Sequence, residues 1–410
     1  MSYDALIIGA GHNGLVAAAL LAKAGLRVLV CERRETPGGL AAAEALFPGF
    51  RVNLGADDAG LLLPEVIREL RLTARGVDFY QPPAAALALH SEGQSLTLWR
   101  DAARTAETLA RHSSADARRF PDFVEQTARF AGLIRQAGRL TPPPLKEASL
   151  QEGWPWLRLG TRIRGLGRRE MMEFLRILPL PVGEYLEEWF ETPLLKAALA
   201  APAILGNPPG PMAAGTTLMM LYHQMGGANG GFKSVRFVKG GMGTLIRALE
   251  TALREHGGEI RTGCPVNRIR VEDGRAVGVE LGDGEVISAR AVLSTADPSR
   301  TFLHLVGAPA LEPRFVRKVR NIRFRGVTAR MILALDGLPA FPESITEAEL
   351  TGYILVCPDL LYMERAADDA KYGRISRHPC LWMTIPTLSD PSLAPPGKHL
   401  LNITMQYAPY

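Results

Sequence analysis

Short apolar blocks separated by glycines dominate the N-terminal part of the chain. Residues 5–8 are fully apolar, as expected for a short buried strand. Residues 15–23 are rich in Ala and Leu and predict a helix that ends at Gly25. Residues 27–31 form a second apolar block that ends at Glu32. The order strand, helix, strand predicts a βαβ unit of about 30 residues.

Three glycines lie between the first predicted strand and the helix, in the sequence GAGHNG: Gly9, Gly11 and Gly14. In a dinucleotide-binding turn the first permits the tight turn, the second lets the pyrophosphate approach the backbone, and the third lets helix and strand pack closely. An acid at the end of the second strand, here Glu32, accepts hydrogen bonds from ribose hydroxyls. The pattern predicts a dinucleotide site; the alternative is a glycine-rich turn that binds nothing.

The rest of the chain mixes predicted helices and strands. Helices are expected over residues 121–137, with Pro121 in the first turn, over 184–200, and after a glycine turn within 239–250. Strands are expected over residues 266–271, 277–281, 286–288, 291–294, 328–334 and 399–406. Asp-Gly pairs separate the first three of these strands and predict hairpin turns.

Composition is that of an ordinary globular protein. The 410 residues are 47% hydrophobic and 22% charged, and the length suits two domains or one large discontinuous domain. The net charge of +5 comes without a zinc finger, an RRM signature or a long basic tract, so no nucleic-acid partner is expected.

Four cysteines are far apart in the sequence: Cys31, Cys264, Cys357 and Cys380. They form no Cys-x-x-Cys pair, so neither a metal site nor a local redox-active disulfide is predicted. Few scattered cysteines suit a reducing compartment, and the sequence contains no recognisable signal peptide or membrane span. A cytoplasmic protein is expected.

Several stretches together resemble a known family. They are GAGHNGL, CERRETPGGLAAAEALFPGFRVNLGA, FVKGGMGTLIRALE and ARAVLSTADP. Their order is similar to that in the phytoene desaturase-like flavoproteins of the FAD-dependent amine oxidase superfamily. Two further stretches, GTTLMMLYHQMGGANGGFKSVRFVKGGMG and SLAPPGKHLLNITMQYAPY, resemble the branch called pyridine nucleotide-disulfide oxidoreductase domain-containing protein 2. The resemblance covers nearly all of the chain.

The resemblance implies an α/β fold with a discontinuous, Rossmann-like FAD-binding domain and a mixed α+β substrate-binding domain that carries a helical insertion. The expected FAD-binding domain comprises residues 1–75 and 232–297. The expected substrate domain comprises residues 76–231 and 298–410.

The resemblance also implies FAD rather than NAD, because Gly38-Gly39 matches the second glycine motif of the superfamily. Paired glycines let the backbone pass close to a long cofactor, although a simple turn also uses them. Val266 matches the position whose backbone contacts the adenine, and it is also an ordinary strand residue. The implied cofactor-binding residues are Gly9, Ala10, Gly11, Asn13, Gly14, Glu32, Arg33, Gly38, Gly39, Leu40 and Val266.

The chemistry implied by the resemblance is oxidation or desaturation of an apolar substrate, carotenoid-like, isoprenoid-like or another lipid, by hydride transfer to flavin. Oxygen or a quinone is the expected electron acceptor. Amine-oxidising relatives carry a lysine near the flavin, whereas the matching stretch RGVTARMILALDG has Thr328 and Arg330 but no lysine. Thiol–disulfide chemistry is rejected because no cysteine pair is encoded.

Two other classes of function stay open. One is a flavoprotein with little catalytic activity that serves as an interaction or assembly factor, because fold does not prove activity. The other is an NAD-dependent dehydrogenase, which rests on the glycine turn and Glu32 alone. His223, in LYHQMGG, is a weak candidate for a catalytic group; its alternative role is a histidine that satisfies a core hydrogen bond.

A peripheral membrane contact is expected from Trp154 to Arg169. This stretch holds two tryptophans, five arginines and no acid, a combination that suits an anionic lipid interface. The alternative is a solvated basic face with buried tryptophans.

No third glycine motif follows Ala296. Family members continue beyond the point where this sequence ends, so the chain is expected to be C-terminally truncated, to bind FAD weakly, to have little activity and to aggregate.

Overall fold

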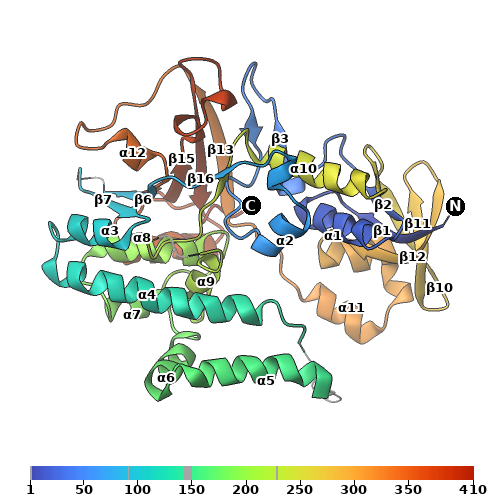
Figure 1. Cartoon of the computed structure of the whole chain (residues 1–410), viewed down its shortest axis with the longest axis horizontal. Helices are drawn as coiled ribbons and strands as arrows, with labels where there is room; N and C mark the ends of the chain where they lie inside the picture. Colours follow the sequence, from blue (N-terminus) through green and yellow to red (C-terminus); the bar gives the residue numbers. More distant parts are fainter. Residues whose placement is uncertain (1, 91, 143–149, 228–229) are drawn as a thin grey trace. The chain divides into compact units, whose positions relative to one another are not determined.

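The computed structural model describes residues 2–90, 92–142, 150–227 and 230–410, which form two compact units (Figure 1). The first unit contains the residues up to Tyr80, Arg236–Phe324 and Ser392–Pro395. The second unit contains Gln81–Val235, Arg325–Pro391 and Pro396–Tyr410.

A six-stranded sheet forms the centre of the first unit, in the order β10-β11-β12-β1-β2-β9. Its strands are β1 (Tyr3–Ile8), β2 (Val28–Cys31), β9 (Glu259–Arg261), β10 (Val266–Glu272), β11 (Arg275–Leu281) and β12 (Val286–Ser294). The central strand β1 is parallel to both β2 and β12, and it places Ile8 opposite Cys31 on one side and Ser294 on the other.

Two helices pack together on this sheet, α1 (His12–Lys23) and α10 (Met242–Glu255). Leu15 and Leu249 are fully buried in the core that they share with β1 and β2. α1 ends where Gly25 adopts φ +85°, a conformation that side chains disfavour. A parallel βαβ unit with packed helices confirms the predicted Rossmann-like α/β class.

The first unit also contains shorter elements. They are η1 (Gly39–Ala41), β3 (Ala43–Glu44), β4 (Val52–Asn53), α2 (Pro64–Glu69), η2 (Thr73–Arg75), β5 (Phe79–Tyr80), β8 (Phe237–Val238), the π-helix η3 (Ser299–Gly307), η4 (Ala308–Ala310) and α11 (Pro313–Arg320). Residues 298–324, which we expected in the substrate domain, pack in this unit because η3 and α11 lie against each other and η3 lies against β10.

The sequence pattern predicted two strands, at residues 286–288 and 291–294, but the structure has one strand there. β12 runs unbroken over Val286–Ser294 and changes partner along its length. Its first residues pair antiparallel with β11, and its later residues pair parallel with β1. The exposed Arg290 that interrupts the apolar pattern therefore marks the change of partner rather than a turn.

The second unit is built on another six-stranded sheet, in the order β13-β16-β15-β14-β6-β7. Its strands are β6 (Ala84–Leu89), β7 (Ser95–Trp99), β13 (Thr328–Leu335), β14 (Tyr353–Val356), β15 (Cys380–Thr384) and β16 (His399–Gln406). Only the β14–β6 pair is parallel among the described strands of this sheet. This mixed sheet agrees with the predicted α+β class.

Helices make up most of the rest of the second unit. They are α3 (Ala102–Leu109), α4 (Ser114–Ala137), α5 (Leu150–Gly165), α6 (Arg168–Ile177), α7 (Val182–Glu187), α8 (Pro193–Ile204), α9 (Thr216–His223), α12 (Glu347–Leu350) and α13 (Leu360–Lys371). Within the described parts of the chain, no helix combines the length and apolar character needed to cross a bilayer.

Two helix predictions were wrong in detail. α4 begins seven residues before Pro121, at Ser114, because the Ser113 hydroxyl caps it by accepting the Asp116 N–H at 3.1 Å. Pro121 thus lies inside the helix. The single helix predicted over 184–200 is two helices, because Pro193 starts α8 at its first turn and breaks the run.

Candidate cofactor site

The turn between β1 and α1 is so tight that two of its glycines cannot carry a side chain. Gly9 has φ +98°, and a Cβ there would lie 2.5 Å from Thr295 Oγ1. A Cβ on Gly14 would overlap the carbonyl oxygen of Gly9. Thr295, just after β12, donates its hydroxyl to the Ile8 carbonyl oxygen at 2.9 Å. These contacts fix the start of α1 against the ends of β1 and β12.

Gly11 differs from the other two glycines, because a Cβ there would meet no atom within 4 Å. It is the N-cap residue of α1, and no side chain caps the first N–H groups of this helix. Such N–H groups and the positive end of the helix dipole stabilise a bound anion. The open space beside Gly11 therefore fits the pyrophosphate of a dinucleotide.

The two glycine motifs meet in space. Gly38 donates its N–H to the Ala10 carbonyl oxygen at 2.8 Å and forms a parallel bridge with Gly11. Gly38 and Gly39 have φ +126° and +57°, so both need the freedom of glycine. A Cβ on Gly39 would lie 3.3 Å from Gly11 Cα. The loop after β2 thus closes directly over the first turn.

Glu32 ends β2 with a buried carboxylate that is 7% exposed. Its Oε2 accepts the Ala10 N–H at 2.8 Å, and its Oε1 accepts the Arg34 N–H at 2.9 Å. Each oxygen retains a lone pair, because a carboxylate accepts up to about four hydrogen bonds. Glu32 thus holds the glycine turn in place and can also accept ribose hydroxyls.

The other predicted residues around this turn differ in their exposure to solvent. Ala10 is buried within it, whereas Asn13 in the first turn of α1 and Arg33 after Glu32 are exposed. Leu40 is 73% exposed, which is unusual for a leucine in an otherwise well-packed loop.

Val266 begins β10 and is buried in an apolar cluster with residues of β1, β2, β11 and β12. It lies near the acid because Cys264, two residues earlier, donates its N–H to the Glu32 carbonyl oxygen at 2.8 Å. The structure therefore brings together the glycine turn, the Gly38 loop, Glu32 and the start of β10. Sequence reasoning did not identify Thr295, whose only sequence signal is its position at the end of an apolar strand.

The four cysteines lie in two pairs in the structure, although their spacing in the sequence did not indicate this. Cys357 directly follows β14, and Cys380 is the first residue of the neighbouring strand β15. Their Sγ atoms are 3.5 Å apart. The neighbouring Cys264 thiol contributes to the raised pKa of Cys31, so these two residues also lie close together. Burial raises the pKa of Cys31 to about 12, and it raises the pKa of Cys357 well above its usual range. All four are free thiols, and burial also raises the pKa of Cys264, so Cys31, Cys264 and Cys357 are protonated at neutral pH.

The second unit holds two polar groups beside aromatic rings. His223 ends α9, contacts the Tyr222 ring edge-on at 5.5 Å, and accepts the Ser234 N–H with its carbonyl oxygen at 2.7 Å. Lys233 is buried with its Nζ 4.6 Å from the centre of the Tyr353 ring, a stabilising cation–π distance. Sequence reasoning did not identify Lys233, because a lysine alone gives no sign of burial.

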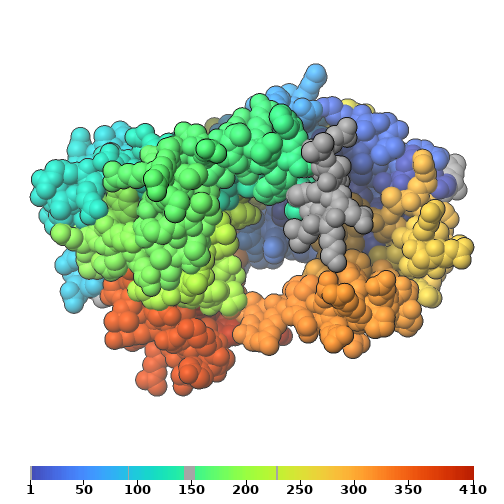
Figure 2. Space-filling view, turned by 90° about the horizontal axis from the view of Figure 1, so that it is seen from below, coloured from blue at the N-terminus to red at the C-terminus, as the bar shows by residue number. Residues whose placement is uncertain are grey.

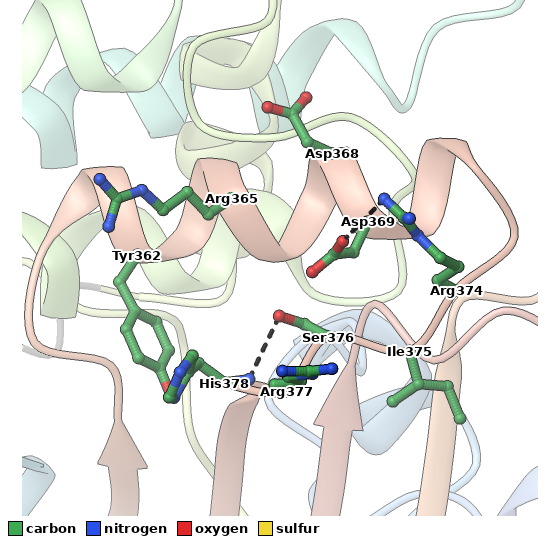
Figure 3. Close-up of a pocket in the computed structure, with 9 residues that line it drawn as sticks. All are labelled: Tyr362, Arg365, Asp368, Asp369, Arg374, Ile375, Ser376, Arg377 and His378. Atoms are coloured by element: carbon green, nitrogen blue, oxygen red, sulfur yellow. Dashed lines mark hydrogen bonds and ion pairs between the residues drawn. The ribbon is translucent and has the colours of Figure 1, made fainter.

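A cavity of about 620 Å³ lies on the second unit between α13 and the loop that follows it (Figure 3). The residues that line it are mostly of charged or polar types. Asp369 forms an ion pair with Arg374 at 3.3 Å, and the Ser376 hydroxyl accepts the His378 N–H at 3.2 Å. A cavity with charged walls does not suit an apolar substrate, so we do not assign the substrate to it.

Comparisons with known proteins agree with the site. Residues 14–409 match the family model of flavin-containing amine oxidoreductases. The chain is 34% identical to pyridine nucleotide-disulfide oxidoreductase domain-containing protein 2 of Rattus norvegicus, and the match covers 100% of this chain and 74% of that protein. It is 28% identical to a zeta-carotene-forming phytoene desaturase of Myxococcus xanthus, over 97% of this chain and 71% of that enzyme.

The fold has relatives among solved structures. An oxidoreductase from Methanosarcina mazei superposes with a TM-score of 0.60 over 98% of this chain and 78% of that one, at 19% sequence identity. The resemblance drawn from the sequence motifs is thereby confirmed, and the family assignment favours FAD over the NAD-dependent alternative. The chain belongs to the flavin-containing amine oxidoreductases, and FAD is its cofactor.

Proposed function

We propose that the glycine turn, the Gly38 loop and Glu32 hold the nucleotide end of FAD. The observation that carries this proposal is the empty space beside Gly11 next to a buried carboxylate. In this arrangement the first turn of α1 binds the pyrophosphate, Glu32 accepts the ribose hydroxyls, and the backbone at Val266 contacts the adenine. Ala10, Asn13, Arg33, Gly39 and Leu40 complete the proposed set.

We further propose that the protein desaturates or oxidises an apolar substrate, of the carotenoid, isoprenoid or lipid class. The support is the similarity to a phytoene desaturase of Myxococcus xanthus, together with the absence of a lysine from the described strand β13. Desaturation removes a hydride from one carbon and a proton from its neighbour. FAD, when bound, supplies the acceptor for that hydride, and we propose oxygen or a quinone as the final electron acceptor.

His223 is our candidate for a polar group near the substrate. It is half-buried at the end of α9, and its ring lies edge-on to the ring of the adjacent Tyr222. The His223→Ala variant should reduce its flavin more slowly if the imidazole receives the substrate proton. Unchanged reduction with a normal flavin content would remove His223 from the site.

We also propose that α5 and the start of α6 contact a membrane peripherally. Trp154 and Leu157 are 65% and 59% exposed, and the arginines from Arg158 to Arg169 are exposed around them. Trp156 donates its ring N–H to the Thr141 carbonyl oxygen at 2.9 Å, so one of the two tryptophans makes a hydrogen bond within the protein. Exposed aromatic and basic side chains together suit an interface with anionic lipid.

Product analysis tests the proposed reaction. The FAD-loaded protein is incubated with phytoene dispersed in lipid and with a soluble quinone as acceptor, and the products are analysed by mass spectrometry. We expect a product that has lost two hydrogen atoms per turnover. The Gly11→Val variant is the matched control, because it should fold without retaining FAD. Equal product from both proteins, or none from the wild type across apolar substrates, would overturn the proposal.

A further inference from the structure

A dense run of positive charge follows the π-helix η3 in the first unit. From Pro313 to Phe324 the chain carries five cations and no acid: Arg314, Arg317, Lys318, Arg320 and Arg323. All five are exposed. Among the residues that the structure describes, none of these five side chains has an ion-pair or hydrogen-bond partner. Some other arginines of the unit do have a partner, such as Arg261, which pairs with Glu285 at 3.0 Å.

The fold directs these charges to one side of α11. Val316 and Val319 are buried, and Phe315 packs edge-on against Phe302 of η3 with ring centres 4.9 Å apart. The helical period then places the four cations of α11 on its solvent-facing side, and Arg323 follows the helix. Orange residues in Figure 2, which include this part of the chain, form part of the exposed surface.

A cavity of about 490 Å³ adjoins the basic face. Leu311, Pro313 and Val316 give it an apolar wall, and Arg317, Arg320 and Asn321 give it a polar one. Two guanidinium groups without partners therefore lie beside an apolar hollow. An amphiphile with an anionic head and an apolar tail matches both walls at once, because the guanidinium is well suited to phosphate.

Two more apolar side chains extend this surface. Ile322 and Phe324 are 43% and 56% exposed, and they directly follow the helix. A nucleic acid or an acidic protein would satisfy the charges, but neither accounts for the apolar wall and the exposed side chains together. A lipid surface accounts for both.

We propose that the α11 cavity binds the phosphate head group of an anionic phospholipid and thereby docks the first unit on an anionic membrane. Arg317 and Arg320 contact the phosphate, and the apolar wall receives the start of an acyl chain. The other cations of the face add long-range attraction to such a surface. None of the residues that line this cavity belongs to the cofactor site or to α5.

Vesicle sedimentation of the FAD-loaded protein tests the proposal. Vesicles of phosphatidylcholine alone are compared with vesicles that also contain phosphatidylglycerol, for the wild type and two double variants. The first variant is Arg317→Gln/Arg320→Gln, which removes the two cavity arginines. The second is Arg314→Gln/Lys318→Gln, which removes equal charge from the same helix outside the cavity. α5 contributes equally to all three proteins, so the comparison isolates α11.

We expect binding only to the anionic vesicles, and at least a tenfold greater loss of binding in the cavity variant than in the matched variant. Equal losses would mean diffuse attraction without a site and would overturn the proposal. Tighter binding of duplex DNA than of anionic vesicles would also overturn it. Flavin absorbance of the same samples should stay unchanged, so a failure here is distinct from a failure of the FAD assignment.

Soluble competitors separate the two sources of the phosphate. A short-chain phosphatidylglycerol should displace the wild type from vesicles at concentrations where inorganic phosphate does not. If inorganic phosphate displaces the protein equally well, the cavity is a site for free phosphate and the lipid assignment is wrong.

Discussion

At the scale of single residues, the three glycines of the first turn should respond differently to substitution. Gly11→Val places its side chain in open space, so the protein should fold normally but lose FAD affinity by on the order of a hundredfold or more. Gly14→Ala overlaps a carbonyl oxygen and should lower the melting temperature itself. Flavin absorbance per protein and thermal unfolding separate the two effects. Stoichiometric flavin in Gly11→Val would contradict the assignment.

The cysteines allow a second prediction at this scale. Only the thiolate reacts with iodoacetamide, and burial raises the pKa of Cys31 to about 12. At pH 8 its thiolate fraction is then roughly a thousandfold below that of an ordinary thiol, and alkylation should be slower in proportion. The reaction should speed up as the pH rises toward 12. Cys357, whose thiol is also buried and protonated, should resist in the same way.

Mass spectrometry of peptides after timed labelling measures these rates. Protein unfolded in urea is the control, and there all four cysteines should react at similar rates. Rapid labelling of native Cys31 or Cys357 would show that the thiols are more accessible, or their pKa values lower, than the fold implies.

At the scale of elements, one buried acid ties two parts of the helical region together. Asp116 in the first turn of α4 accepts the N–H groups of Glu191 and Thr192 at 2.9 and 2.8 Å, just before α8. The Asp116→Ala variant leaves both donors without an acceptor, and we expect it to lose about 3 kcal/mol of unfolding free energy.

The neighbouring Asp122 is exposed on the same helix and provides the matched control. Asp122→Ala should change stability by less than about 0.5 kcal/mol. Urea unfolding followed by fluorescence reports on this region, because Trp189 packs edge-on against Phe123 at 5.5 Å. Equal stability of the two variants would mean that Asp116 does not hold the two parts together.

The elements also show which signals in the sequence are reliable. The three elements of the βαβ unit were predicted to within three residues at each end, because strand, turn and helix each carry local signals. β12 was misjudged because its change of partner is set by β1, which is distant in the sequence. Pro121 was misjudged because a proline at the first turn is the usual case, whereas here the Ser113 cap starts α4 earlier.

At the scale of the whole molecule, the family was readable from widely spaced motifs, but several site contacts were not. Thr295 bonds to Ile8 across 287 residues, and the Cys357–Cys380 contact depends on the pairing of β14 with β15. Such contacts arise only after the sheets form, and a single sequence gives no direct sign of them. The glycine turn is local in the sequence and was therefore predicted, whereas the Thr295 and Cys357–Cys380 contacts join distant segments and were not.

We propose that this FAD-dependent oxidoreductase removes hydrogen from carbon atoms of an apolar substrate. The most direct test is the visible absorbance of the FAD-loaded protein, recorded without oxygen during mixing with phytoene and, separately, with putrescine. We expect the flavin absorbance to bleach on mixing with the hydrocarbon and to return when air is admitted or a quinone is added. Bleaching by the amine but not by the hydrocarbon would contradict the proposed reaction.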